Sequence, residues 1–195
     1  MKKLVVFDFD GTLTKRDSFF YFLKTCFPFS KISIGALILF PVLVLYKVKM
    51  LNNDLAKEKV LKFFWKGIDA NSFQQKCNWF SQEIIPKLLT ASAKKCLKEY
   101  ESNGFEIVIL SASPEIYLKP WCNTNKYQCL STKLKIEYGK YTGAYDGDNC
   151  RGIVKLNRLK EAFRLEEYNE IHAYGDTDDD KIFMAIAHHQ FFKAL

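Results

Sequence analysis

Three short stretches with the composition of buried strands constrain the fold of this 195-residue chain most strongly. They cover residues 3–8, 105–110 and 170–174. Their lengths and their β-branched and aromatic residues are typical of buried strands. Segments with helical patterns separate them, and strands that alternate with helices indicate a parallel sheet covered by helices. The sequence therefore predicts an α/β fold with a Rossmann-like parallel-sheet core.

The second half of the chain contains further predicted elements. Ser113 and Pro114 are predicted to open a helix, with Ser113 as its N-cap and Pro114 in its first position. Residues 130–146 alternate in polarity and contain two glycines, a pattern typical of a hairpin. Residues 153–165 are predicted to be helical, and residues 190–194 to form a last edge strand.

The long helical block between the first two strands is too large for a simple crossover connection. It is therefore predicted to be an inserted cap. We expect residues 1–14 and 102–195 to form the core that contains the sheet, and residues 15–101 to form a helical cap.

One segment of this cap, residues 32–46, contains no charged residue. Lys31 precedes it, Lys47 and Lys49 follow it, and Pro41 lies inside it. A membrane-spanning helix needs about 20 apolar residues, so the segment is short for that role. Two interpretations have equal weight: a buried cap helix, or a re-entrant or interfacial hairpin that contacts a membrane with its lysines at the headgroups.

The composition excludes several classes of protein. Hydrophobic residues make up 48% of the chain and charged residues 26%, which excludes wholesale disorder, a collagen-like repeat and a polytopic membrane protein. The net charge of +7 favours an anionic partner, but the basic residues are spread along the chain without a nucleic-acid motif. The six cysteines have no metal-binding spacing, and the first apolar run is too short for a secretory signal. We expect a reduced, cytoplasmic protein, free or at the inner face of a membrane, with no nucleic-acid partner.

Acidic motifs follow the first and third predicted strands. Residues 8–12 read Asp-Phe-Asp-Gly-Thr, and residues 175–180 read Gly-Asp-Thr-Asp-Asp-Asp. Ligands of parallel α/β sheets bind beyond the carboxyl ends of the strands. Paired carboxylates there can hold Mg²⁺, and one can attack phosphorus while the other handles a proton. Taken singly, the first motif could be a polar turn, and the second an acidic helix N-terminus.

Two further residues suit an anion. Ser111 ends the second strand just before a predicted helix N-terminus, where a hydroxyl and free backbone N–H groups can hold an anion. Lys155 could neutralise phosphate charge. Taken alone, Ser111 could be a simple cap residue and Lys155 a surface lysine.

Together, these motifs and their order resemble the haloacid dehalogenase superfamily, in its phosphatase-type members. Residues 8–12, 110–113, Lys155 and 175–180 resemble its four motifs. The resemblance extends from about residue 4 to 188, and the stretch from Ser131 to Lys155 resembles the phosphoserine-phosphatase-like branch.

The resemblance implies a role for each motif residue. Asp8 is expected to be the nucleophile that forms an aspartyl-phosphate, and Asp10 to protonate the leaving alcohol and then activate water. Ser111 and Lys155 are expected to bind the phosphoryl oxygens. The acid at Asp10 favours a phosphatase, since the superfamily's dehalogenases and ATPases lack it.

The resemblance also implies a metal site. Asp8, the backbone carbonyl of Asp10 and Asp176 are expected to hold Mg²⁺, with Asp180 supporting it. Mn²⁺ accepts the same oxygen ligands, so the sequence leaves these two ions open.

Substrate recognition is less defined by the resemblance. Gly11, Thr12 and Ala112 are expected to contribute to substrate binding, and Asp17 matches an acid that helps phosphoserine phosphatases to recognise their amino acid. Those enzymes carry asparagine where this chain has Asp179, which puts a phosphate contact of that residue in doubt. They also bind the substrate carboxylate with a cap arginine, and the body of this cap has none.

The apolar segment 32–46 resembles the cap of phosphatidylglycerophosphate phosphatases of the same branch. The favoured substrate is therefore a membrane lipid phosphate, and the partner a membrane contacted through residues 32–46. The alternative is a soluble phosphatase for a phosphorylated small molecule such as phosphoserine. A non-catalytic basic binding module is a third hypothesis, which the clustered charges disfavour.

Overall fold

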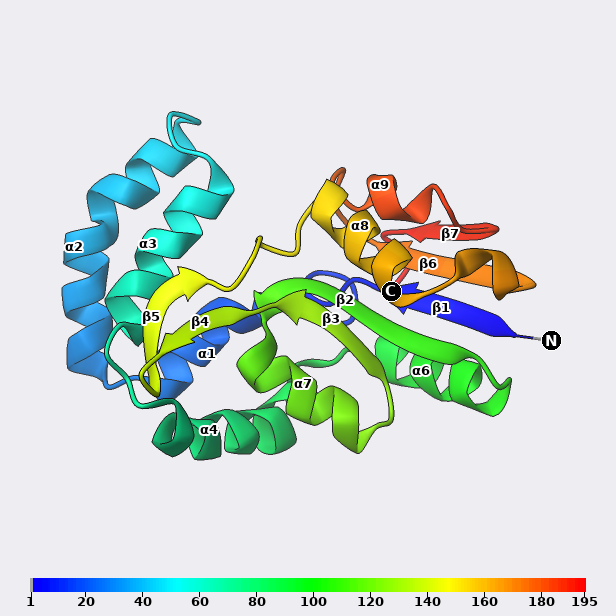
Figure 1. The fold of residues 1–195 in the computed structure, drawn as a ribbon, viewed down its shortest axis with the longest axis horizontal. Coiled ribbons are helices and arrows are strands. Elements are labelled where there is room, and N and C mark those ends of the chain that lie inside the picture. Colours follow the sequence, from blue (N-terminus) through cyan, green and yellow to red (C-terminus); the bar gives the residue numbers. More distant parts are fainter. Residues whose placement is uncertain (1) are drawn as a thin grey trace.

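A five-stranded parallel sheet forms the centre of the computed structural model, which describes residues 2–195 (Figure 1). The strand order is β3–β2–β1–β6–β7, and every neighbouring pair is parallel. The predicted α/β class is confirmed, and β7 occupies the expected edge position. The strands are β1 (Lys3–Phe7), β2 (Glu106–Pro114), β3 (Gln128–Thr132), β6 (Glu170–Gly175) and β7 (His189–Phe192).

Both faces of the sheet are covered, because successive side chains of a strand point to opposite faces. On β1, Val5 and Phe7 belong to one hydrophobic cluster, and Leu4 and Val6 belong to the other. Helices complete both layers, as Figure 1 shows. The first cluster includes residues of α6 (Ala91–Ser102) and α7 (Glu115–Thr124), and the second includes residues of α8 (Ile153–Ala162) and α9 (Lys181–Met184).

The segment between β1 and the sheet helix α6 forms a separate helical layer (Figure 1). Aromatic packing organises it: the Phe22 ring stacks on Trp65 of the same layer, with centroids 5.7 Å apart, and on Tyr117 of the sheet helix α7, with centroids 4.7 Å apart. Its helices are α1 (Ser18–Cys26), α2 (Phe29–Lys47), α3 (Asn53–Trp65), α4 (Ala70–Trp79), a π-helical turn (Phe80–Ile84) and α5 (Ile85–Leu88).

The predicted hairpin is confirmed, but it packs against the cap and not against the sheet. It consists of β4 (Leu134–Glu137) and β5 (Lys140–Tyr145). The Tyr141 N–H donates to Ile68 O, and the Gly67 N–H donates to Tyr141 O, both at 2.9 Å. The cap is therefore built from two parts of the chain, and the expectation that residues 102–195 belong wholly to the core needs this correction.

The boundary after the first insertion also shifts. Helix α6 packs against the sheet, with Ala93, Cys96 and Leu97 in the same cluster as Val5 and Phe7. The packing therefore places the end of the inserted helices nearer to residue 90 than to the expected residue 101.

The charge-free segment lies within a single helix, α2, and Pro41 is inside it. Gly35 and Leu39 are its only buried residues, and 11% of its apolar 18-residue window is buried. Gly35 allows α2 to approach α3 closely, because a Cβ there would lie 2.8 Å from a ring atom of Phe63. The structure therefore does not support the interpretation as a buried cap helix. By length and composition, α2 is the one described helix that could cross a membrane.

Candidate active site

The strand order brings the predicted acids to one edge of the sheet. The chain runs from β1 through β2 to β3 on one side and then returns to β6 and β7 on the other. Open α/β sheets bind ligands where the strand order reverses. Asp8 follows β1 at this point, Asp176 follows β6, and Ser111 lies near the carboxyl end of β2.

Gly11 allows the loop after β1 to approach the loop after β6. Its φ is +89°, a conformation that residues with a side chain rarely adopt. A Cβ at this position would also collide with the carboxylate of Asp176. The glycine of the first motif therefore lets Asp176 lie against the backbone that carries Asp8 and Asp10.

Lys155 connects two of the acids. Its Nζ lies 2.5 Å from Asp8 Oδ1 and 2.6 Å from Asp180 Oδ1, and all three residues are buried. Burial raises the pKa of Asp8 to about 7, although the Lys155 charge acts in the opposite direction. Burial alone would lower the pKa of Lys155, but the two carboxylates outweigh it and raise that pKa.

Three carboxylates gather as a candidate metal site. One oxygen from each of Asp8, Asp176 and Asp180 lies within 4.8 Å of the others. Asp176 Oδ1 is buried and has no hydrogen-bond partner in the described part of the chain. Burial and the nearby Asp180 charge raise the pKa of Asp176. An unpartnered carboxylate oxygen among three acids and one lysine suits a hard divalent cation such as Mg²⁺.

Asp180 differs from the other two acids because both of its oxygens have protein partners. Oδ1 accepts from Lys155, and Oδ2 accepts from the Thr177 hydroxyl at 2.6 Å and the Thr177 N–H at 3.0 Å. Burial acts to raise the pKa of Asp180, but Lys155 and Thr177 lower it below its usual value. This arrangement holds Lys155 in place and fits the supporting position expected for Asp180.

The Asp10 carboxylate points away from these acids. It accepts from the Ser18 N–H at 2.6 Å and from the Ser113 hydroxyl at 2.5 Å. Burial, followed by the charge of Asp17, raises the pKa of Asp10, while both hydrogen bonds act to lower it. A raised pKa favours the protonated form that a general acid needs. Its side chain does not join the metal cluster, and the expected metal ligand is its backbone carbonyl.

The predicted N-cap role of Ser113 is wrong. Helix α7 begins at Glu115, Pro114 occupies the cap position, and no side chain caps the helix. The Ser113 hydroxyl instead donates to Asp10, which lies 103 positions away in the sequence. No local sequence pattern predicts this contact between β2 and the first loop. The sequence around Ser113 showed only the pattern of a helix cap.

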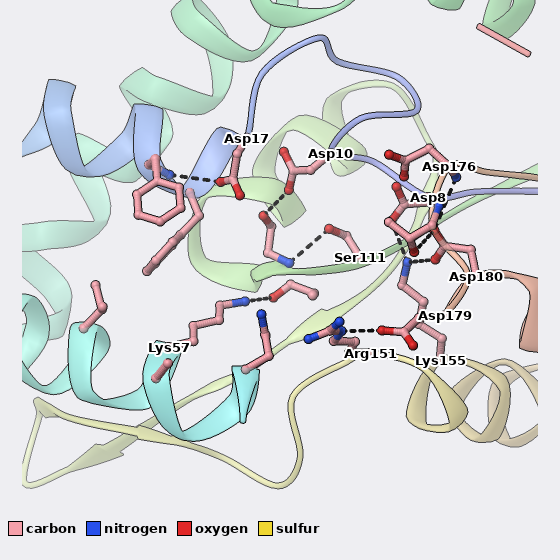
Figure 2. Close-up of a pocket in the computed structure, with 18 of the residues that line it drawn as sticks. Asp8, Asp10, Asp17, Lys57, Ser111, Arg151, Lys155, Asp176, Asp179 and Asp180 are labelled. Atoms are coloured by element: carbon pink, nitrogen blue, oxygen red, sulfur yellow. Dashed lines mark hydrogen bonds and ion pairs between the residues drawn. The ribbon is translucent and has the colours of Figure 1, made fainter. Parts of the chain in front are cut away.

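A cavity of about 310 Å³ joins these groups (Figure 2). Ser111, Ala112 and Asp17 line it together with Asp8, Asp10, Asp176 and Asp180. Asp17 also accepts from the Phe20 N–H as the N-cap of α1. Gly11 and Thr12 do not line the cavity, and the buried Thr12 hydroxyl has no partner within residues 2–195.

The cavity also contains groups that the motifs did not indicate. Lys57 of α3 and Arg151 line it, and Arg151 Nε donates to Asp179 Oδ2 at 2.5 Å. Asp179 thus faces a guanidinium, which offsets its charge. No sequence pattern distinguished Lys57 from the other lysines of α3.

The sequence matches the haloacid dehalogenase-like hydrolase family over residues 5–184. It is 35% identical over 187 residues to protein CicA from Caulobacter vibrioides, covering 94% of this chain and 82% of that protein. The fold is similar to that of a Bordetella pertussis protein of unknown function, with a TM-score of 0.80, 19% identity, and coverage of 97% and 89% of the two chains. A substrate-bound phosphoserine phosphatase has a TM-score of 0.69 at 17% identity, with coverage of 98% and 86%. The chain therefore belongs to the haloacid dehalogenase-like hydrolase family.

Proposed function

We propose that this enzyme is a Mg²⁺-dependent phosphomonoesterase that forms an aspartyl-phosphate on Asp8. The main support is the position of Asp8 at the switch point of the sheet, beside Lys155 and the metal-binding acids. Asp8, Asp176 and the Asp10 carbonyl would hold the Mg²⁺, which would offset phosphate charge when bound.

The residues of the chain divide the reaction between them. The Asp8 carboxylate attacks phosphorus and forms a P–O bond, while the bond to the alcohol oxygen breaks. Asp10 gives its proton to that oxygen, and the alcohol leaves. The Asp10 carboxylate then takes a proton from a water molecule, which attacks phosphorus and releases phosphate from Asp8. Ser111 and Lys155 bind the phosphoryl oxygens through both steps.

Asp8→Asn tests this assignment. Phosphate release from a soluble phosphomonoester in Mg²⁺ should fall at least 1,000-fold, as losses of this order follow removal of a nucleophile (about 10³ or more). Asp178→Asn is the matched control, because Asp178 is an exposed acid of the motif at residues 175–180 that pairs with Lys181 and lies outside the three-carboxylate cluster. Full activity of the Asp8 variant would disprove the assignment.

A membrane lipid phosphate is the proposed substrate. Leu43 and Tyr46 of α2 and Phe20 of α1 line the same cavity as the catalytic acids. Helix α2 also carries an exposed apolar surface that includes Leu37, which is 79% exposed, and Phe40. Large exposed apolar patches mark binding surfaces, and lysines next to them favour anionic headgroups. We propose that the enzyme works at the cytoplasmic face of a membrane, with α2 in contact with lipid.

Vesicle binding and substrate preference test this part of the proposal. The protein should sediment with anionic vesicles, and Leu37→Glu should abolish sedimentation. Ile136→Glu, on an exposed residue of β4, should have no effect. Phosphate release from phosphatidylglycerophosphate in mixed micelles should exceed release from phosphoserine at the same concentration.

A soluble phosphoserine phosphatase is the second candidate function. The fold similarity to a phosphoserine phosphatase and the cationic Lys57 in the cavity favour it. It predicts that phosphoserine is the better substrate and that the protein does not sediment with vesicles.

A further inference from the structure

Lys57 and Arg151 are two cations in the cavity that the proposed chemistry does not use. The phosphoryl group that reacts at Asp8 already has Lys155 as its cation. Figure 2 shows Lys57 and Arg151 on one side of the cavity and Asp10 and Asp17 on the other. Lys57 comes from the cap helix α3, and Arg151 from the core segment just before α8.

Asn149 contacts both residues, through its side chain for Lys57 and through its backbone for Arg151. Lys57 Nζ donates to Asn149 Oδ1 at 3.3 Å and to Ala112 O at 2.5 Å. The backbone N–H of Arg151 donates to the backbone carbonyl of Asn149 at 2.7 Å, and the Arg151 guanidinium bonds to Asp179. Asn149 is itself buried, and its side chain also bonds to Asp54 and Thr132. The Asn149 side chain therefore holds Lys57 of the cap against the core, and Arg151 follows Asn149 two residues later in the chain.

Both cations have hydrogen-bonding capacity left for a ligand. No carboxylate within residues 2–195 forms an ion pair with Lys57, whose partners are a backbone carbonyl and an amide. Arg151 uses Nε for Asp179, and its two terminal nitrogens have no partner in the part of the chain that the structure describes. A guanidinium presents these donors in the planar arrangement that suits a phosphate or carboxylate.

We propose that Lys57 and Arg151 form a second anion subsite, so that the substrate carries another oxyanion besides the phosphoryl group that is removed. This inference rests on the proposed phosphatase function and narrows its substrate class. A phosphodiester or a carboxylate near the phosphomonoester would satisfy it. The apolar side chains of Leu43 and Tyr46 in the same cavity favour the phosphodiester of a lipid headgroup.

The test compares three soluble substrates in Mg²⁺. Glycerol phosphate has no second anion, phosphoserine has a carboxylate, and glycerophosphoglycerol phosphate has a phosphodiester. The ratio of kcat/KM for each two-anion substrate to that for glycerol phosphate is the readout. Arg151→Gln and Lys57→Gln should each lower the higher ratio roughly ten- to hundredfold, the effect of losing a charged hydrogen bond. The compound with the higher ratio identifies the second anion.

Two variants control for charge loss elsewhere. Lys62→Gln changes an exposed lysine of the same helix, and Arg164→Gln an exposed arginine of the core. Both should leave the ratios unchanged. Equal losses for all three substrates, or unchanged ratios in the Lys57 and Arg151 variants, would overturn the proposal.

A binding measurement separates this proposal from the proposed function. In an Asp8→Asn background, titration calorimetry with glycerophosphoglycerol phosphate and phosphoserine should show weaker binding on adding Arg151→Gln. Weaker binding supports the anion subsite even if the protein releases no phosphate. Unchanged binding of both compounds refutes the subsite.

Discussion

Ser113→Ala should move the alkaline limb of the kcat/KM profile to higher pH by about one unit. In the proposed reaction, Asp10 must carry a proton when the alcohol leaves, so activity falls as pH rises through its pKa. The Ser113 hydroxyl donates to Asp10 Oδ2 at 2.5 Å, which stabilises the ionised carboxylate and lowers its pKa. Removing this donor raises the pKa and extends activity to higher pH.

The size of the shift follows from the hydrogen bond. A hydrogen bond to a charged group contributes about 1.5–3 kcal/mol. One pKa unit corresponds to about 1.4 kcal/mol, so complete loss would shift the pKa by roughly one to two units. The Ser18 N–H still donates to Oδ1 at 2.6 Å, which favours the lower end of this range.

The assay is initial phosphate release from a soluble phosphomonoester at saturating Mg²⁺ between pH 5 and 10. Ser131→Ala is the matched control, because Ser131 is a buried serine of the neighbouring strand whose hydroxyl contacts Cys129 Sγ and not Asp10. An alkaline limb that stays in place or moves to lower pH in the Ser113 variant would refute the assignment of Asp10.

Three further predictions concern other parts of the site. Lys155→Met leaves Asp8 and Asp180 buried without their cation and should lower the free energy of unfolding by about 3–5 kcal/mol in urea at pH 7.5. The loss should be smaller at pH 5, where the raised pKa of Asp8 lets it carry a proton. Gly11→Ala should lower the free energy of unfolding by about 1–3 kcal/mol, because φ is positive at this position, and should also weaken activation by Mg²⁺. Gly147→Ala, at a position with a similar φ and open space around it, should lower stability alone. Burial lowers the pKa of Lys57 to about 8, so the kcat/KM ratio of two-anion to one-anion substrates should fall as pH rises through 8, and Lys57→Gln should remove this dependence.

Local sequence patterns predicted the features that depend on neighbouring residues. The strands at 3–8 and 170–174 were visible from composition, and the acids behind them from their position after a strand. Because all carboxyl ends of a parallel sheet lie at one edge, the pattern also predicted that Asp8 and Asp176 would approach each other. The hairpin within residues 130–146 was visible from its alternation and glycines.

The features that the sequence did not predict depend on distant contacts. The Ser113 hydroxyl could bond either to the neighbouring helix terminus or to Asp10. It bonds to Asp10 because the packing of the sheet brings β2 next to the first loop. Lys57 resembled other surface lysines until α3 turned it toward Asn149. The apolar composition of α2 was equally consistent with burial and with exposure, because composition does not specify which surface the helix faces.

The hairpin β4–β5 has a consequence for how the cavity can open. The cap is connected to the sheet at both ends of its helical insertion and at both ends of the hairpin, and the hairpin is hydrogen-bonded to residues 67–70. A cap held by a single pair of linkers can swing aside like a hinged lid. Here the second pair of connections opposes such a swing. Leu43 and Tyr46 of α2 line the cavity, so we expect a bulky substrate to enter past this helix.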